Sequence, residues 1–298
     1  MNDVHTSILF YLFAFIIGDD FNQFPTLNCQ ASFIFVKSSN SLSSSSTINT
    51  IGHPFIELAA VDSTNNYAFD KLQANLAAHG TAYFAQEQTA GKGQRGKVWN
   101  AEPGSSIILS VTLDTAFLLI HQQFLLSVAI GLAAHDLFSK YAGDETKIKW
   151  PNDIYWRDRK AGGILIESSV KTNKSGKTVW KWAVVGLGIN INQTKFPKNL
   201  SNPVSLKQIT GKNFDTFLLA KELCDCLQKR FSQLKKGAAK KQLEEYNLHL
   251  YKLQEIVRLK KNNAAFHCTV EGVTKSGELI VSGAAQESFV WGEVEWQL

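Results

Sequence analysis

A glycine-rich segment with three positive charges is the first part of this sequence that could do chemistry. The run Gly91 to Gly96 reads GKGQRG, and Lys92, Arg95 and Lys97 alternate with its glycines. Cationic side chains and accessible backbone N–H groups together favour an anion such as a nucleotide phosphate or an acyl phosphate. We therefore expect an anion-handling loop here, with a simple surface loop as the alternative.

The same glycines match GxGxxG, the fingerprint of dinucleotide-binding folds. That fold needs a helix that begins at the third glycine, Gly96, because the helix N-terminus holds the pyrophosphate. Pro103 and Gly104 exclude a helix before the next expected strand. Neither a Walker A sequence nor the HRD and DFG sequences of protein kinases occur in the chain. The spacing therefore predicts neither a dinucleotide-binding fold nor a kinase.

A second group of reactive side chains lies in the stretch KWPNDIYWRDRKAGGILIE, which begins at Lys149. Asn152 and Asp153 follow a proline that ends one strand, and Lys160 enters the next strand beside two consecutive glycines. Glycines inside a strand indicate close approach by a ligand, or a β-bulge. For Lys160 the alternative is an ordinary lysine at the end of a hairpin.

Two further segments carry polar groups at element boundaries. Residues 184–192 read VVGLGININ, which places Gly186, Gly188 and Asn190 inside an apolar strand. The run DSTN at residues 62–65 offers several N-cap side chains to the helix expected after it.

Strand and helix patterns become regular after Ile51 and alternate along the chain. Apolar residues at helical spacing predict helices over 67–77, 117–141, 215–234 and 238–250. Short apolar runs bounded by turns predict strands over 55–60, 82–86, 106–112, 148–150, 154–156, 163–168 and 179–185. Because tight hairpin turns join several of these strands, we expect an α+β fold with a mixed or mainly antiparallel sheet and helices on one face.

From Glu255 the pattern changes to short alternating strands separated by glycine-containing turns. This spacing predicts a small C-terminal β-barrel of about five strands, SH3-like in size. We therefore divide the chain into an N-terminal extension (1–50), a catalytic domain (51–250) and a C-terminal domain (251–298).

The N-terminal extension has a composition unlike the rest of the chain. The apolar run at residues 8–17 is shorter than the roughly 20 residues that a transmembrane helix needs, and the first Lys or Arg is Lys37. A serine-rich stretch at residues 38–47 is typical of a linker. We expect residues 1–50 to lie outside the working fold, with a weak export or anchoring signal as the alternative.

Overall composition limits the class of protein. The chain has 298 residues, a formal net charge of +5, four cysteines and seven histidines. The mild positive charge does not indicate a nucleic-acid-binding protein, and the scattered cysteines indicate reduced thiols in a cytoplasmic protein. No HxxxH or HExxH pattern supports a protein-bound catalytic metal.

Four motifs in order, DSTN, QTAGKGQRGKVW, KWPNDIYWRDRKAGGILIE and VGLGINI, make the chain resemble the biotin–protein ligases. The resemblance spans Phe55 to about Asn192 and implies a class-II-synthetase-like catalytic domain followed by an SH3-like domain. The DNA-binding domain of the repressor subtype is not matched, so the resemblance is to the ligase-only subtype.

The resemblance implies an activity with three substrates. Biotin and ATP, the latter as its Mg²⁺ complex, would form biotinyl-5'-AMP, and a lysine of a biotin carboxyl carrier protein would then take the biotinyl group. No tightly bound prosthetic group, nucleic acid or membrane is expected, and the chain would be a monomer or a weak homodimer.

The resemblance also assigns site residues by position. It assigns biotin contacts to Ser63, Thr64, Asn65, Gln88, Lys92, Gly93, Gln94, Gly162 and Gly163. It assigns ATP contacts to Lys92, Arg95, Trp99, Asn152, Asp153, Lys160 and Asn190, and catalysis to Lys160 and Arg95. It places Asn152, Asp153 and Asn190 around ATP or its metal, and it leaves the ligands of the metal unassigned.

One position departs from the family pattern. Many members carry Arg where this chain has Gln94, so the charge of the loop differs. Two alternatives stay open: a lipoate–protein ligase of related fold, and a non-catalytic regulator that binds biotin or a nucleotide.

Overall fold

The computed structural model describes residues 50–172, 178–198, 200 and 202–297. The predictions for residues 1–49, including the apolar run, the serine-rich stretch and Cys29, lie outside the described residues.

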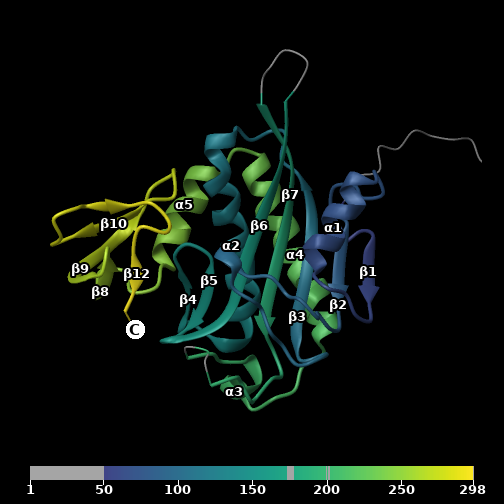
Figure 1. Cartoon of the computed structure of the whole chain (residues 1–298), viewed down its shortest axis with the longest axis horizontal. Coiled ribbons are helices and arrows are strands. Elements are labelled where there is room, and N and C mark those ends of the chain that lie inside the picture. The colour runs from purple at the N-terminus through teal and green to yellow at the C-terminus, as the bar shows by residue number, and fades with distance from the viewer. Residues whose placement is uncertain (1–49, 173–177, 199, 201, 298) are drawn as a thin grey trace, which may run out of the picture. The chain divides into compact units, whose positions relative to one another are not determined.

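A seven-stranded mixed sheet forms the centre of the fold, in the order β1-β2-β3-β7-β6-β5-β4 (Figure 1). Only β1 and β2 are parallel, and every other neighbouring pair is antiparallel. This arrangement confirms the predicted α+β class. The strands are β1 (Phe55–Leu58), β2 (Ala82–Ala85), β3 (Ser106–Asp114), β4 (Thr146–Lys149), β5 (Asp153–Trp156), β6 (Arg159–Thr172) and β7 (Thr178–Asn190).

Helices pack on both faces of this sheet, which corrects the prediction that they cover one face. Ile107 and Leu109 of β3 join the main apolar core, to which α2 and α4 contribute. Ser110, the residue after Leu109, points to the opposite face because strand side chains alternate, and it hydrogen bonds to side chains of α1. The helices are α1 (Thr64–Gln73), α2 (Gln123–Ala142), α3 (Leu206–Thr210), α4 (Thr216–Lys235) and α5 (Ala239–Leu248).

The long apolar helix begins later than the sequence predicted. Phe117 was expected to start it, but α2 begins at Gln123 after a short 3₁₀ turn, Ile120–Gln122. The Asp114 carboxylate accepts a hydrogen bond from the Ala116 N–H, and this local bond holds the preceding segment in a turn.

The C-terminal residues form a separate antiparallel sheet in the order β11-β10-β9-β8-β12. Its five strands match the predicted number. They are β8 (Ile256–Lys261), β9 (Ala264–Val273), β10 (Leu279–Ser282), β11 (Ser288–Phe289) and β12 (Glu295–Trp296). Asn247 of α5 bonds through its amide to both backbone groups of Val273, and Trp150 Nε1 donates to the Gly277 carbonyl. The C-terminal sheet therefore packs directly on α5 and on the turn that follows β4.

Three cysteines lie in the described part of the chain, and all are free thiols. Cys224 and Cys268 are buried, and burial raises the pKa of Cys224 to about 12. Among the described residues, no helix is long and apolar enough to cross a membrane.

Two stacked histidines join α2 to the end of α5. The rings of His135 and His249 lie 4.1 Å apart, and His135 Nε2 lies 3.1 Å from the Thr146 carbonyl oxygen. Burial, with a smaller effect from His249, lowers the pKa of His135 to about 4. Burial and then Lys147 lower the pKa of His249. Both rings are therefore held neutral at neutral pH.

The pKa of His135 in the folded state lies below the unfolded value of about 6.5. This difference stabilises the fold above pH 6.5, and the stabilisation is lost as the pH falls toward the folded-state pKa. We expect the His135→Phe variant, which keeps a ring but cannot titrate, to show a weaker pH dependence of unfolding free energy. Between pH 7 and pH 5 the difference should be about 2 kcal/mol, measured by urea denaturation. An equal pH dependence in both proteins would contradict this assignment.

The start of the fold can be tested by truncation. Ile51 is 1% exposed, and its backbone N–H donates to Gln228 Oε1 at 2.7 Å. A chain that begins at Thr50 should keep the stability of the full protein. A chain that begins at Pro54 should lose about 1.5–3 kcal/mol of unfolding free energy, because it lacks the buried Ile51 side chain. Equal stability of the two truncated chains would place the start of the fold after Ile51.

Candidate functional site

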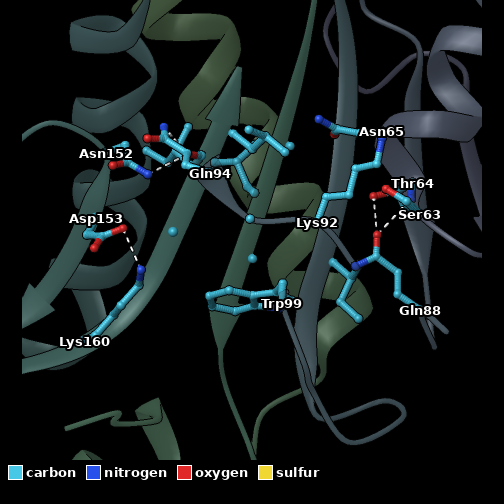
Figure 2. A pocket seen from close by; sticks show the side chains of 18 residues that line it. Ser63, Thr64, Asn65, Gln88, Lys92, Gln94, Trp99, Asn152, Asp153 and Lys160 are labelled. Carbon is cyan, nitrogen blue, oxygen red and sulfur yellow. Dashed lines mark hydrogen bonds and ion pairs between the residues drawn. The ribbon is translucent and has the colours of Figure 1, made fainter. Parts of the chain in front are cut away.

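A cleft of about 60 Å³ opens on the face of the large sheet that carries α1 (Figure 2). It brings together residues that are far apart in the sequence. Predicted site residues that line it are Ser63, Thr64, Asn65, Gln88, Lys92, Gly93, Gln94, Trp99, Asn152, Asp153, Lys160 and Gly163.

One end of the cleft consists of hydroxyl and amide groups around the start of α1. Gln88 Oε1 accepts hydrogen bonds from the Thr64 N–H at 2.8 Å and from the Thr64 hydroxyl at 3.0 Å. Ser63 is the N-cap residue of α1, but its side chain makes no capping hydrogen bond. Ser63 is buried, with 1% of the residue exposed. Its hydroxyl is therefore free to hydrogen bond to a polar group of a ligand in the cleft.

Two residues that the sequence did not single out hold this end in place. Ser110 donates to Asn65 Oδ1 at 2.6 Å, and Asn65 Nδ2 donates to Glu167 Oε2 at 2.7 Å. A Cβ at Gly186 would lie 2.4 Å from Asn65 Oδ1, so this glycine makes room for the amide. A serine inside the apolar strand SIILSVT was the one sequence signal that could have identified Ser110.

The opposite end of the cleft is charged. Lys160 Nζ lies 2.7 Å from Asp153 Oδ1, with side chains 33% and 20% exposed respectively. Asn152 Nδ2 donates to the Ile164 carbonyl at 2.9 Å, next to this pair. A half-buried ammonium held by one carboxylate can still turn toward an anion in the cleft.

A β-bulge in β6 directs Lys160 to this face. Tyr155 pairs with Lys160 and Ile154 pairs with Gly162, so the register shifts by one residue between them. Without the shift, Lys160 and Gly163 would point to opposite faces of the sheet, because strand side chains alternate. The bulge therefore places the lysine beside the glycine that lines the cleft.

The floor of the cleft is a pair of facing glycines covered by an indole ring. Gly163 pairs with Gly188 across β6 and β7. A Cβ at Gly188 would lie 2.4 Å from the Trp99 ring, whereas the nearest atoms to a Cβ at Gly163 are 3.5 Å away. Trp99 thus rests against bare backbone between the two polar ends (Figure 2).

The structure does not bring Lys92 and Arg95 of the glycine-rich loop together. The loop closes as a hairpin in which the Trp99 N–H bonds to the Gly91 carbonyl. Lys92 Nζ hydrogen bonds to Asn66 Oδ1, on the α1 side. Arg95 has a left-handed backbone (φ 55°) inside the 3₁₀ turn Gln94–Gly96 and points away from the cleft. Its side chain and that of Lys92 therefore point in different directions.

Arg95 contacts the C-terminal sheet instead. Its guanidinium lies 5.3 Å from the centre of the Trp291 ring, and its Nη1 lies 3.5 Å from the Gly292 carbonyl oxygen. A Cβ at Gly292 would lie 2.6 Å from the guanidinium, so the glycine permits this contact.

Two other predicted residues also lie outside the cleft. Gly162 faces the core, where a Cβ would sit 2.9 Å from the Gly188 carbonyl oxygen. Asn190 is 4% exposed and donates to the carbonyl oxygens of Val204 at 3.1 Å and Lys160 at 3.5 Å. Asn190 therefore positions the segment that carries Lys160 and does not itself line the cleft.

Lys149, near the charged end, was not among the predicted site residues. It is 8% exposed and donates to the Tyr155 hydroxyl at 3.1 Å. The rings of Tyr155, Trp296 and Tyr251 surround its ammonium at 4.6, 5.2 and 5.9 Å. Burial lowers the pKa of Lys149 to about 8, although Asp153 opposes this shift. The cage links β4 and β5 to the last strand of the C-terminal sheet.

Comparison with known proteins adds to this geometry. The model of the Biotin/lipoate A/B protein ligase family matches residues 57–190. The biotin--[acetyl-CoA-carboxylase] ligase of Paracoccus denitrificans is 32% identical over 244 residues, which cover 76% of this chain and 94% of that protein. This chain belongs to the biotin–protein ligase family.

Other members of the biotin–protein ligase family are matched over part of their length. The bifunctional ligase/repressor BirA of Escherichia coli is 32% identical over 169 residues, 55% of this chain and 49% of that protein. The chain thus spans about half the length of the bifunctional relatives that it matches.

Solved structures of the biotin–protein ligase family share the fold. The biotin protein ligase from Aquifex aeolicus in complex with biotin and ATP has a TM-score of 0.67 at 23% identity, over 81% of this chain and 97% of that chain. The enzyme from Leishmania major in complex with biotin has a TM-score of 0.54 at 21% identity, over 80% and 98%.

The contact of Trp99 with Gly188 can be tested by adding one methyl group. Gly188→Ala should push the indole from the floor and loosen the hairpin that Trp99 closes. We expect trypsin to cleave after the loop cations at least about threefold faster than in the parent protein. Gly163→Ala is the matched control and should change cleavage little, because its methyl group meets only ordinary contacts. Equal cleavage of both variants would show that Trp99 does not hold the loop.

Proposed function

We propose that this chain is an ATP-dependent biotin–protein ligase. It activates biotin as biotinyl-5'-AMP and transfers the biotinyl group to a lysine of a biotin carboxyl carrier protein. Family membership supports a ligase of this kind, and the cleft supports biotin as the acid that it activates.

The order of polarity along the cleft is the observation that carries the proposal. Neutral hydroxyl and amide groups lie at one end, a glycine and indole floor lies in the middle, and the Lys160–Asp153 pair lies at the other end. Biotin has the same order: a neutral ureido ring, an apolar body and chain, and a carboxylate. A ureido ring needs both donors and acceptors, which Ser63 and Gln88 can supply.

The first step joins the biotin carboxylate to the nucleotide. A carboxylate oxygen attacks the α-phosphorus of ATP, and the bond from that phosphorus to the leaving pyrophosphate breaks. The carboxylate is already ionised at neutral pH, so this step needs positioning and positive charge more than proton transfer. We assign Lys160 to the developing phosphate charge, Asp153 to the orientation of its ammonium, and Asn152 to a polar contact beside them.

The nucleotide brings its own Mg²⁺ as part of the substrate. Within the described residues, no cluster of three or more acidic, histidine or cysteine side chains could hold a metal by itself. Lys92 and Trp99 remain our proposed contacts to the bound ligands. A contact between Arg95 and the phosphates requires the guanidinium to leave Trp291.

The second step forms the product amide. The amine nitrogen of the carrier lysine attacks the acyl carbon, the carbon–oxygen bond to the phosphate breaks, and AMP leaves with the electron pair. The amine must lose a proton to do this. Asp153 is our proposed acceptor, although its Oδ1 already pairs with Lys160.

Pyrophosphate release tests the function and its alternatives. We expect release from MgATP with biotin and little release with lipoate, because a lipoyl dithiolane leaves the hydroxyl and amide groups unpaired. Release with lipoate alone would indicate a lipoate–protein ligase, and release with neither acid would indicate a non-catalytic binding protein.

Lys160→Ala should lower kcat for pyrophosphate release by about 10²-fold or more. Lys212→Ala, a control at an exposed lysine just after the short helix α3, should leave this rate close to that of the parent protein. An unchanged rate in Lys160→Ala, with the fold intact by circular dichroism, would remove Lys160 from the mechanism.

A further inference from the structure

A second cavity of about 210 Å³ lies directly behind the charged end of the cleft. Gln94, Asn152 and Ile164 line both spaces, so they form the partition between them. The amides of Gln94 and Asn152 both donate to the Ile164 carbonyl oxygen, at 3.2 and 2.9 Å. The second cavity therefore adjoins the Lys160 end of the cleft and not the hydroxyl end.

The walls of this cavity are polar but uncharged. Gln123 and Ser127 come from α2, Ser168 from β6, and the indoles of Trp180 and Trp291 from β7 and the C-terminal sheet. Among the described residues that line it, none carries a charge. No lining side chain is a cation that could pair with a triphosphate, and Arg95, which lies against the Trp291 ring, does not line the cavity, so the lining disfavours the nucleotide.

One buried acceptor lies at this partition without a partner. Gln94 Oε1 is buried and makes no hydrogen bond to any described residue, whereas its Nε2 is used by Ile164. A buried unpaired acceptor destabilises the folded protein unless a ligand donor satisfies it. The group best suited to the partition is thus a hydrogen-bond donor.

An uncharged lining also lowers the pKa of an amine that enters the cavity. An ammonium group that enters loses water and gains no counter-charge, so its pKa falls and the neutral, nucleophilic amine is favoured. The volume is ample, because a cavity needs only roughly 10–15 Å³ to hold one water.

We propose that this second cavity is the acceptor site, which takes the primary-amine side chain of the carrier lysine and presents its nitrogen at Gln94. The alkyl stem lies between Trp291 and Ile166, and the nitrogen reaches the acyl carbon past the partition. The nitrogen–carbon bond forms as the acyl carbon–oxygen bond breaks, AMP leaves with the electron pair, and the nitrogen gives its proton to Asp153, the acceptor proposed above. This inference rests on the proposed ligase function.

Filling the cavity separates the two half-reactions. Ser127→Phe should slow transfer from preformed enzyme–biotinyl-AMP at least about 10-fold, both to a biotin carboxyl carrier protein and to N-α-acetyl-lysine amide. Pyrophosphate release with biotin should stay within about threefold of the parent rate. Ser168→Phe fills the same space from β6 and serves if Ser127→Phe does not fold. Ser139→Phe, on the same helix but outside both cavities, is the control and should change neither rate.

A charge placed in the cavity gives a second readout. Ser127→Asp should hold the amine protonated and shift the pH profile of transfer upward by about one unit, whereas Ser127→Asn should not.

No pyrophosphate release from the parent protein would refute the ligase function itself. Normal transfer in both filled variants, or equal loss of pyrophosphate release and transfer, would refute the acceptor site. Slowed transfer to the carrier protein with normal transfer to the small amine would show that the cavity only docks the carrier protein. This result would also refute the acceptor site.

Discussion

The pairing of Gly163 with Gly188 across β6 and β7 is the contact on which the site depends. β7 pairs along both edges, with β3 on one side and β6 on the other, so its backbone is held rigidly in the middle of the sheet. Two facing residues without side chains leave a strip of bare backbone there, and the Trp99 indole lies against it. Larger residues at these positions would fill the cleft from its floor.

Rigid neighbours then orient the polar ends of the cleft. Ser110 from β3 and Glu167 from β6 use both atoms of the Asn65 amide, and Gln88 caps the first turn of α1. Since an unpaired buried polar group costs about 1–3 kcal/mol, this network resists rotation of any member. The groups that remain free to bind are consequently held in place before a ligand arrives.

The C-terminal sheet takes part in the site, although it is remote in sequence. Trp291 stacks on Arg95 of the glycine-rich loop, and Trp296 forms part of the aromatic cage around Lys149. The two contacts tie this sheet to the loop on one side and to the charged end of the cleft on the other. A shift of the C-terminal sheet would therefore change both the position of the loop and the environment of Lys149.

The resemblance of four short motifs to the biotin–protein ligases identified most residues of the cleft. Local patterns in the sequence determined the α+β class and the number of C-terminal strands, because turn residues and alternation act over a few positions. They could not determine which face a side chain takes after a bulge, and so Lys160 and Gly162 were assigned to one surface when β6 sends them to opposite ones. Nor could they determine where Arg95 points, because its partner Trp291 lies far along the chain. Strand register and contacts between distant segments decided these positions, since both depend on hydrogen bonds and packing that form only when the whole sheet has assembled.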